Sequence, residues 1–209
     1  MDGIHDLGWF VLSGLLLNIT PGADTLYIVA RATTQGARAG AVAALGIGAG
    51  CIVHALAAAL GLSAIIATSA TAFAFVKWIG AAYLVYLGFS LLAGRAATGT
   101  AAPPAPASLR RVFVQGFLTN VLNPKVALFF LAFLPQFIAA DASHKALALL
   151  LLGTIFNVNG TLWNLLVAWS AGGLSRRLPV PSCVAAGLRR SVGAVFVVLG
   201  LRLAVAERG

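Results

Sequence analysis

Charge is the scarcest property of this 209-residue sequence. Only 9% of its residues are charged, with 14 basic and 5 acidic side chains, against roughly a quarter in an ordinary soluble domain. So few charges cannot solvate the surface of a soluble globular enzyme. Intrinsic disorder is excluded as well, because it requires much charge and few apolar residues, whereas 60% of this chain is hydrophobic.

Cysteine and histidine are also rare. The two cysteines are Cys51 and Cys183, and the three histidines are His5, His54 and His144. Their spacing forms neither a disulfide framework nor a metal site, and the glycine-rich phosphate loop of ATPases is missing. An integral-membrane enzyme would need a nucleophile with its base, or a metal cluster, at the membrane interface. We therefore expect no cofactor, no metal and no enzymatic activity.

Long apolar runs, in contrast, fill most of the chain. A helix crosses a bilayer with about 20 apolar residues. The N-terminus lacks the basic segment of a cleaved signal peptide, so the first run is expected to remain as a span. The predicted fold is an all-α polytopic membrane protein with six transmembrane helices. These helices cover residues 7–29, 40–68, 73–92, 112–137, 146–169 and 192–206.

The basic residues between these runs predict the orientation of the chain. Lys and Arg accumulate in cytoplasmic loops, and they favour the first, third and fifth loops, so both termini are predicted to lie on the periplasmic or outer side. This bias accounts for the net charge of +9 without nucleic-acid binding. The loop residues are Arg31, Arg38, Arg95, Arg110, Arg111, Arg176, Arg177, Arg189 and Arg190, against Lys77, Lys145, Arg202 and Arg208 on the other side.

The two halves of the sequence share a weak repeat. In the first and fourth spans a Gly and an Asn keep the same spacing, and a Pro follows with a one-residue slip. Residues 77–88 and 190–200 likewise share a basic residue, a Gly and an aromatic residue. The matched residues of the first and fourth spans are Gly14, Asn18 and Pro21, and Gly116, Asn120 and Pro124.

Three spans in each half require the halves to be inserted in opposite directions, as in many secondary transporters. We therefore predict two inverted three-helix repeats, at residues 1–95 and 112–209, within one membrane domain. A Pro- and Ala-rich cytoplasmic linker at residues 96–111 joins them. Chance similarity between Leu- and Ala-rich helices is the alternative.

Polar residues surround helix breakers in spans one and four. Proline removes a backbone donor and clashes with the preceding turn, and the backbone groups that it frees must be satisfied by protein or by a water-filled cavity. A charged side chain near the bilayer centre costs at least ~2.5–3.5 kcal/mol. A plain proline kink would not explain why charged residues lie beside both prolines. We predict that both helices are broken and that the breaks form the substrate site. Its residues are Asn18, Thr20, Pro21, Gly22, Asp24, Asn120, Asn123, Pro124 and Lys125.

The expected site offers both signs of charge. Helix N-termini after the breaks attract anionic groups, and helix C-termini before them attract cations. Asp24 and Lys125 add one charge of each sign, so the site fits a zwitterionic amino acid. Two alternatives stay open: Asp24 and Lys125 form a structural ion pair, or the protein exports an inorganic cation or another small metabolite. A non-transporting subunit would leave the charged breaks unexplained.

Two further groups of polar residues have a functional and a structural interpretation. His54 is either a proton relay for ion coupling, together with Asp24, or an interhelical hydrogen-bonding residue. In the fifth span, Asn157, Thr161 and Asn164 share one face at i, i+4 and i+7. With Asn159 they predict either interhelical hydrogen bonds, which we prefer, or the lining of a pore.

These motifs resemble the LysE-type (lysine exporter/RhtB) amino-acid exporters over nearly the whole chain. The segment from Pro21 to Asp24 is similar to the family pattern Pro-Gly-Pro-Asp/Asn, with Ala23 in place of the second proline, and Asn123-Pro124-Lys125 matches the pattern Asn-Pro-Lys. The resemblance implies secondary export of amino acids or close derivatives across the bacterial inner membrane. It also implies homodimers and coupling to an ion, which we expect to be a proton, and we expect alternating access.

Overall fold

The computed structural model describes most of the chain. Its described residues are helical, apart from turns, loops and one isolated β-bridge between Ile4 and Ile138, and they contain no strand. The all-α prediction is therefore confirmed for this part of the molecule. The described residues are 3–62, 70–93, 105–139 and 141–174, with the single positions 190, 191, 194, 197, 198, 200, 201 and 204.

Helices of different lengths build the molecule. Short π or 3₁₀ turns extend three of them without a gap in the chain. The main helices are α1 (Leu7–Ile19), α2 (Ala23–Gln35), α3 (Ala37–Ala57), α5 (Ala70–Leu92), α6 (Leu109–Val121), α7 (Pro124–Leu128) and α8 (Lys145–Trp169). The extensions are η1 (Ala58–Leu62) after α3, η2 (Phe129–Phe133) and η3 (Leu134–Phe137) after α7, and η4 (Ser170–Leu174) after α8.

The first predicted span is a broken helix. α1 ends at Ile19 and α2 begins at Ala23. Pro21 has no N–H group and disfavours the helical conformation of the residue before it, and Thr20 is accordingly extended, with φ −65° and ψ 117°. Helical hydrogen bonding resumes where the N–H of Leu26 donates to the carbonyl of Gly22 at 3.0 Å. The predicted break is confirmed.

The fourth predicted span is broken as well. Its two parts, Leu109–Val121 and Pro124–Phe137, meet at an angle of 46°. Asn123 caps the second part, because its Oδ1 accepts a hydrogen bond from the N–H of Lys125 at 3.0 Å. Pro124 occupies the first helical position, where its missing N–H has no helical partner to lose. This break also follows the prediction.

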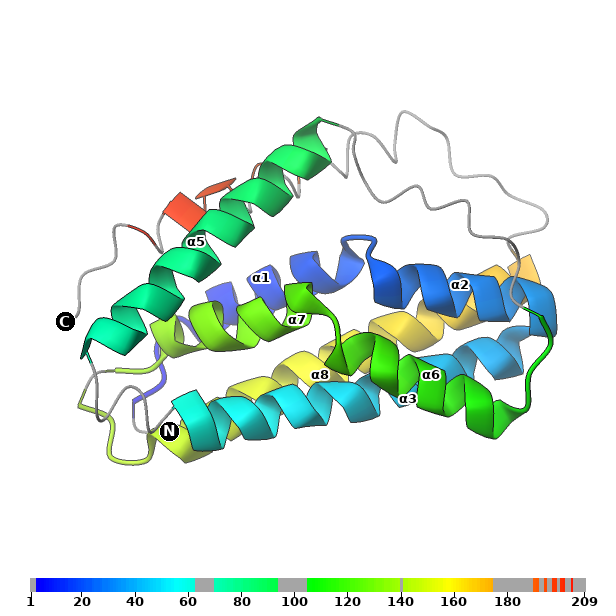
Figure 1. Cartoon of the computed structure of the whole chain (residues 1–209), viewed down its shortest axis with the longest axis horizontal. Helices are drawn as coiled ribbons and strands as arrows, with labels where there is room; N and C mark the ends of the chain where they lie inside the picture. The colour runs from blue at the N-terminus through cyan, green and yellow to red at the C-terminus, as the bar shows by residue number, and fades with distance from the viewer. Residues whose placement is uncertain are drawn as a thin grey trace.

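The two broken helices lie along the long axis of the molecule and run in opposite directions, with their breaks near its middle (Figure 1). α3 and α8 run beside them without such a break. Close helix contacts depend on glycine. Gly46 of α3 packs against the carbonyl of Phe113, and a Cβ added to Gly116 of α6 would lie 2.6 Å from the carbonyl oxygen of Ala43.

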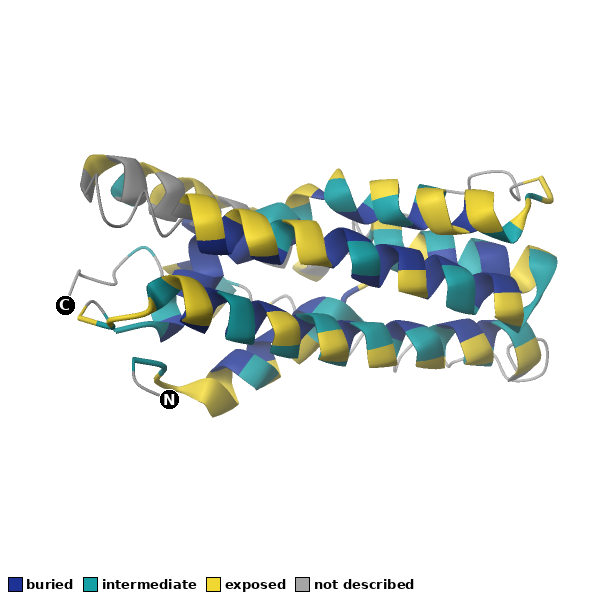
Figure 2. Ribbon diagram, turned by 90° about the horizontal axis from the view of Figure 1, so that it is seen from below, coloured by how far each residue is buried: buried dark blue, intermediate teal, exposed yellow. Residues whose placement is uncertain are grey.

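The outer surface of the bundle is apolar. Buried residues face the interior and exposed residues face outward (Figure 2). The segments Ala37–Gly61 and Lys145–Gly173 are long and apolar enough to cross a membrane, and the broken pair of α6 and α7 forms a third candidate span. These features support a membrane protein. Large exposed apolar side chains include Trp9, Leu45, Phe75, Leu122, Leu162 and Trp169.

Five of the six predicted spans correspond to described helices, although residues 63–68 of the second span lie outside the described residues. The sixth, 192–206, lies outside the described residues except for a few single positions, and residues 96–104 of the predicted linker lie outside them too. α6 begins at Leu109, where the Ser108 hydroxyl accepts from the N–H of Arg111 at 3.4 Å, so residues 109–111 are helical. The two inverted three-helix repeats stay a prediction.

One end of the bundle closes around a buried arginine. α2 continues to Gln35, so Arg31, which the sequence places in a loop, lies on a helix and is only 4% exposed. Its guanidinium donates to Gln35 Oε1 and Gln115 Oε1, both at 2.8 Å, and to the carbonyl of Ala105 at 3.0 Å. We call this region the arginine end. It consists of Tyr27, Arg31, Gln35, Gln115 and the chain at 105–107.

The opposite end closes around aromatic rings. The rings of Phe129 and Phe156 stack with centroids 4.4 Å apart, and Phe10 meets Phe137 edge-on at 5.3 Å. Such pairs contribute to stability beyond the apolar area that they bury. We call this region the phenylalanine end. It consists of Phe10, Phe129, Phe130, Phe133, Phe137 and Phe156.

Candidate functional site

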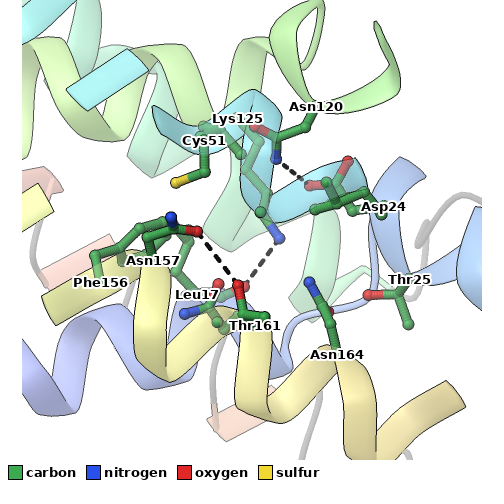
Figure 3. Close-up of a pocket in the computed structure, with 15 residues that line it drawn as sticks. Leu17, Asp24, Thr25, Cys51, Asn120, Lys125, Phe156, Asn157, Thr161 and Asn164 are labelled. Atoms are coloured by element: carbon green, nitrogen blue, oxygen red, sulfur yellow. Dashed lines mark hydrogen bonds between the residues drawn. The ribbon is translucent and has the colours of Figure 1, made fainter. Parts of the chain in front are cut away.

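A cavity of about 30 Å³ lies between the two helix breaks. This volume holds about two water molecules, so in this conformation the site is too small for an amino acid. Figure 3 shows side chains from both broken helices and from α3 and α8 turned toward it. The lining residues are Leu17, Asn18, Asp24, Thr25, Ile47, Gly48, Cys51, Asn120, Lys125, Val126, Phe156, Asn157, Gly160, Thr161 and Asn164.

Lys125 connects the second break to the first. Its ammonium group donates to the carbonyl oxygens of Leu17 and Thr20, each at 2.9 Å. Carbonyls at the C-terminal end of a helix have no partner within the helix, and a cation is favourable there. An ammonium group has three N–H donors, so one remains for a ligand in the cavity.

Asp24 connects the first break to the second. Its Oδ2 accepts a hydrogen bond from Asn120 Nδ2 at 2.8 Å. Its Oδ1 is buried and has no partner among the described residues, and the same is true of Asn120 Oδ1. Asn120 itself is only 3% exposed. The cavity therefore has two buried oxygen acceptors on its lining side chains whose hydrogen-bonding capacity is unused.

The two breaks thus stabilise each other crosswise. Lys125, which follows the second break, binds carbonyls at the first, and Asn120, which precedes the second break, binds the carboxylate that follows the first. Within the described part of the chain, Asp24 and Lys125 do not form an ion pair at 4.0 Å or less. The structural ion pair considered as an alternative is not present in this conformation.

The nine predicted site residues divide into two groups. Asn18, Asp24, Asn120 and Lys125 line the cavity. The other five build the breaks around it. Thr20 is buried and its hydroxyl donates to the carbonyl of Leu16 at 2.7 Å. Asn123 caps α7, Pro21 and Pro124 are exposed, and a Cβ on Gly22 would lie 3.5 Å from Lys125 Nζ.

His54 lies behind the cavity lining. Its Nε2 lies 3.0 Å from the carbonyl oxygen of Asn120, which can only accept, so the ring donates this hydrogen bond. The ring also stacks on Phe130, with centroids 5.9 Å apart. His54 therefore contacts the residue that binds Asp24, although it does not line the cavity itself.

The structure places the polar face of the fifth span in the cavity. Asn157, Thr161 and Asn164 of α8 all line it. From the sequence we expected these three side chains to form interhelical hydrogen bonds. The described residues contain no such bond. The one bond that these side chains make joins Thr161 to Asn157 within α8, at 3.3 Å. The pore-lining interpretation therefore describes this face better.

Several lining residues gave no functional signal in the sequence. Leu17, Val126 and Phe156 look like ordinary apolar helix residues, and from the sequence Cys51 is only one of two cysteines that form no disulfide framework. Gly160 could have been found, because it shares the helical face of Asn157, Thr161 and Asn164. Among the described residues, no group of three or more His, Cys, Asp or Glu could hold a metal ion.

Comparison with known proteins identifies the family. Residues 15–207 match the family model of the LysE type translocators. The chain is 31% identical over 209 residues to an uncharacterized membrane protein of Pseudomonas aeruginosa, which covers 98% of this chain and 97% of the relative. No solved structure matches the chain.

Two relatives carry functional names. A homoserine/homoserine lactone efflux protein of Salmonella typhi is 29% identical, over 95% of this chain and 97% of its own length. A leucine efflux protein of Salmonella choleraesuis is 26% identical, over 98% of this chain and 97% of its own length. The chain belongs to the LysE type translocator family and is a membrane transporter, not an enzyme.

Proposed function

We propose that this protein exports small amino acids or close derivatives across the bacterial inner membrane, through the cavity between the two breaks. The efflux proteins among its relatives support export of amino acids. One observation carries the proposal: Asp24 and Lys125 line the same small cavity and do not neutralise each other by direct contact. A ligand with one charge of each sign would complement both.

The unused hydrogen-bonding groups match the two ends of an amino acid. Asp24 Oδ1 and Asn120 Oδ1 can accept from a substrate ammonium group. Lys125, through its remaining N–H, and Asn18, through its unpartnered Nδ2, can donate to a substrate carboxylate. Hydrogen bonds that involve an ionised group are about twice as strong as neutral ones, and buried polar atoms are costly when they stay unpaired. Substrate binding would therefore relieve an existing cost.

Transport requires the cavity to widen. A volume of about 30 Å³ cannot hold an amino acid, so the helices must separate on one side and then on the other. The breaks after α1 and α6 can act as hinges, because residues at element ends absorb such changes. In this proposal the arginine end faces the cytoplasm, the phenylalanine end faces outward, and both termini lie on the outer side.

Ion coupling uses the same residues. Asp24 is the candidate proton acceptor within the cavity, and His54 is connected to it through Asn120. The protonation of Asp24 would change its attraction for a substrate ammonium group, which would couple proton movement to transport. We also propose that the protein works as a homodimer in the lipid bilayer.

Transport by purified protein in liposomes tests the site. We expect Asp24→Asn to reduce amino-acid transport about 10- to 100-fold, because a hydrogen bond to a charged group is worth about 1.5–3 kcal/mol, and we expect Lys125→Met to reduce it at least as much. Asp141→Asn and Lys145→Met change the same residue types outside the cavity and should leave transport intact. Wild-type rates from both site variants would refute the proposed site.

A labelling experiment measures binding independently of transport. Cys51 lines the cavity, so a Cys183→Ser protein reports on this site through its remaining thiol. We expect saturating amino acid to slow the reaction of Cys51 with a thiol reagent in wild-type-like protein, and to have no such effect after Asp24→Asn. Equal labelling rates with and without amino acid would contradict binding in this cavity.

A further inference from the structure

The wall of the cavity that α8 forms is uncharged, and three of its five lining residues have polar side chains, with Phe156 the one large apolar residue. Asn157, Gly160, Thr161 and Asn164 follow one another on a single helical face. Asn164 is only 8% exposed, and its side chain has no hydrogen-bond partner in the described residues. A largely buried amide with unused hydrogen-bonding groups favours a ligand or water that can satisfy them. This face therefore contributes binding groups that are distinct from the charged ones.

Two glycines, which lack a side chain, leave the space that the Asn18 and Thr161 side chains occupy. A Cβ on Gly160 would lie 2.9 Å from Asn18 Oδ1, and a Cβ on Gly48 of α3 would lie 2.7 Å from Thr161 Oγ1. Any larger residue at Gly48 would displace the Thr161 hydroxyl. The backbone approach of α3 to α8 thus fixes the position of the hydroxyl at the cavity surface.

The charged and uncharged groups come from different elements. Asp24, Asn120 and Lys125 belong to the two broken helices, whereas Thr161 and Asn164 project from α8 on another side of the cavity (Figure 3). An amino acid divides in the same way, into charged backbone groups that all substrates share and a side chain that differs. The charged residues suit the shared part, which leaves the α8 face for the side chain.

We propose that Thr161 and Asn164 determine specificity, and that they select amino acids with a short side chain bearing a hydroxyl or amide group. The proposal rests on the function proposed above. An aliphatic side chain would leave the Asn164 amide without a partner and would add none to the Thr161 hydroxyl, whose one hydrogen bond goes to Asn157 Oδ1. Sites built to hydrogen-bond a substrate reject analogues that lack the group far more strongly than apolar pockets reject a missing methylene. The small cavity adds a preference for short side chains, which require less opening.

The test compares two substrates in one liposome assay. Homoserine carries a short hydroxylated side chain and leucine a branched aliphatic one. We expect wild-type protein to prefer homoserine in kcat/KM. Thr161→Val, which removes the hydroxyl but keeps the shape, and Asn164→Leu should each lower the homoserine-to-leucine ratio at least about tenfold. The Thr161→Ser variant should keep the wild-type ratio, because serine retains the hydroxyl group.

Asn159→Leu is the matched control, since Asn159 lies on α8 but does not line the cavity. The homoserine-to-leucine ratio of kcat/KM in the Asn159→Leu variant should equal that of the wild-type protein. The inference is overturned if wild-type protein prefers leucine, if the ratio does not change in the two variants, or if both substrates lose kcat/KM equally, as expected for contacts to the shared backbone groups. If wild-type protein transports neither amino acid, the proposed function itself fails.

Discussion

The two ends of the bundle, on either side of the cavity, are held together by different physical means. At the phenylalanine end, six aromatic rings pack against one another. At the arginine end, one buried guanidinium joins α2, α6 and the chain at Ala105 by hydrogen bonds. Ring packing depends mainly on buried apolar area and only secondarily on stacked or edge-on geometry, whereas each hydrogen bond depends on a specific partner in a specific position.

This difference predicts which end opens more easily. Opening the arginine end exchanges protein hydrogen bonds for hydrogen bonds to water, and each exchange costs only about 0.5–1.5 kcal/mol net. Opening the phenylalanine end exposes aromatic surface at about 25 cal/mol for every Å². We therefore expect the arginine end to open more readily from the closed structure. Three substitutions test the contrast in stability between the ends, from the largest effect to the smallest.

The close contact of α3 and α6, next to the arginine end, is the most sensitive feature. Gly116→Ala would place a methyl group 2.6 Å from the Ala43 carbonyl oxygen, and backbone cannot move aside as a flexible side chain can. We expect a loss of at least about 2 kcal/mol in the free energy of unfolding, measured by thermal unfolding in detergent. Gly8→Ala is the control, because no atom lies within 4 Å of its added Cβ. Similar melting temperatures for the two variants would contradict the close contact.

The arginine network itself should have an intermediate effect. Arg31→Met keeps the length of the side chain and removes its hydrogen bonds to Gln35, Gln115 and the Ala105 carbonyl. Tyr27 still donates to Gln115, which limits the loss, and we expect about 1–2 kcal/mol. Arg38→Met, at an exposed position on α3, is the comparison. If Arg31→Met raises the melting temperature, the buried charge is a burden on stability and the network does not hold this end closed.

The phenylalanine end should tolerate a conservative change best. Phe133→Leu keeps most of the apolar volume, and neighbouring rings such as Phe129, 5.1 Å away between centroids, can shift to fill the space. We expect a loss of about 1 kcal/mol. Phe75→Leu on the exposed face of α5 should cost less. A loss larger than that of Gly116→Ala would reverse the contrast between the two ends.

Local chemistry made the helix breaks predictable. Pro21 and Pro124 each lack the N–H group of a helical hydrogen bond and clash with the preceding turn, so each kinks or breaks a helix, and polar residues at membrane depth point to a site. The partners of these residues were not predictable. That Lys125 binds the carbonyls of Leu17 and Thr20 depends on how two distant helices pack, and helical periodicity within one span carries no information on that register.

Burial was the other quantity that the sequence did not reveal. Arg31 looks like an ordinary loop arginine because it follows an apolar run, yet it is almost completely buried. For Asn157, Thr161 and Asn164, periodicity correctly predicted one shared face. It could not decide whether that face meets another helix or the cavity, because this depends on the close approach that Gly48 permits from α3.

The crosswise contacts between the breaks have a consequence for biogenesis. During synthesis the first half of the chain enters the membrane before Lys125 exists, so the carbonyls of Leu17 and Thr20 lack their later partner, and Asp24 lacks Asn120. Until the second broken helix is inserted, these backbone carbonyls and the Asp24 carboxylate remain without their hydrogen-bond partners. Neither half should therefore mature alone, and co-expression of two separate half-chains should protect each from the proteolysis that removes it when it is expressed singly.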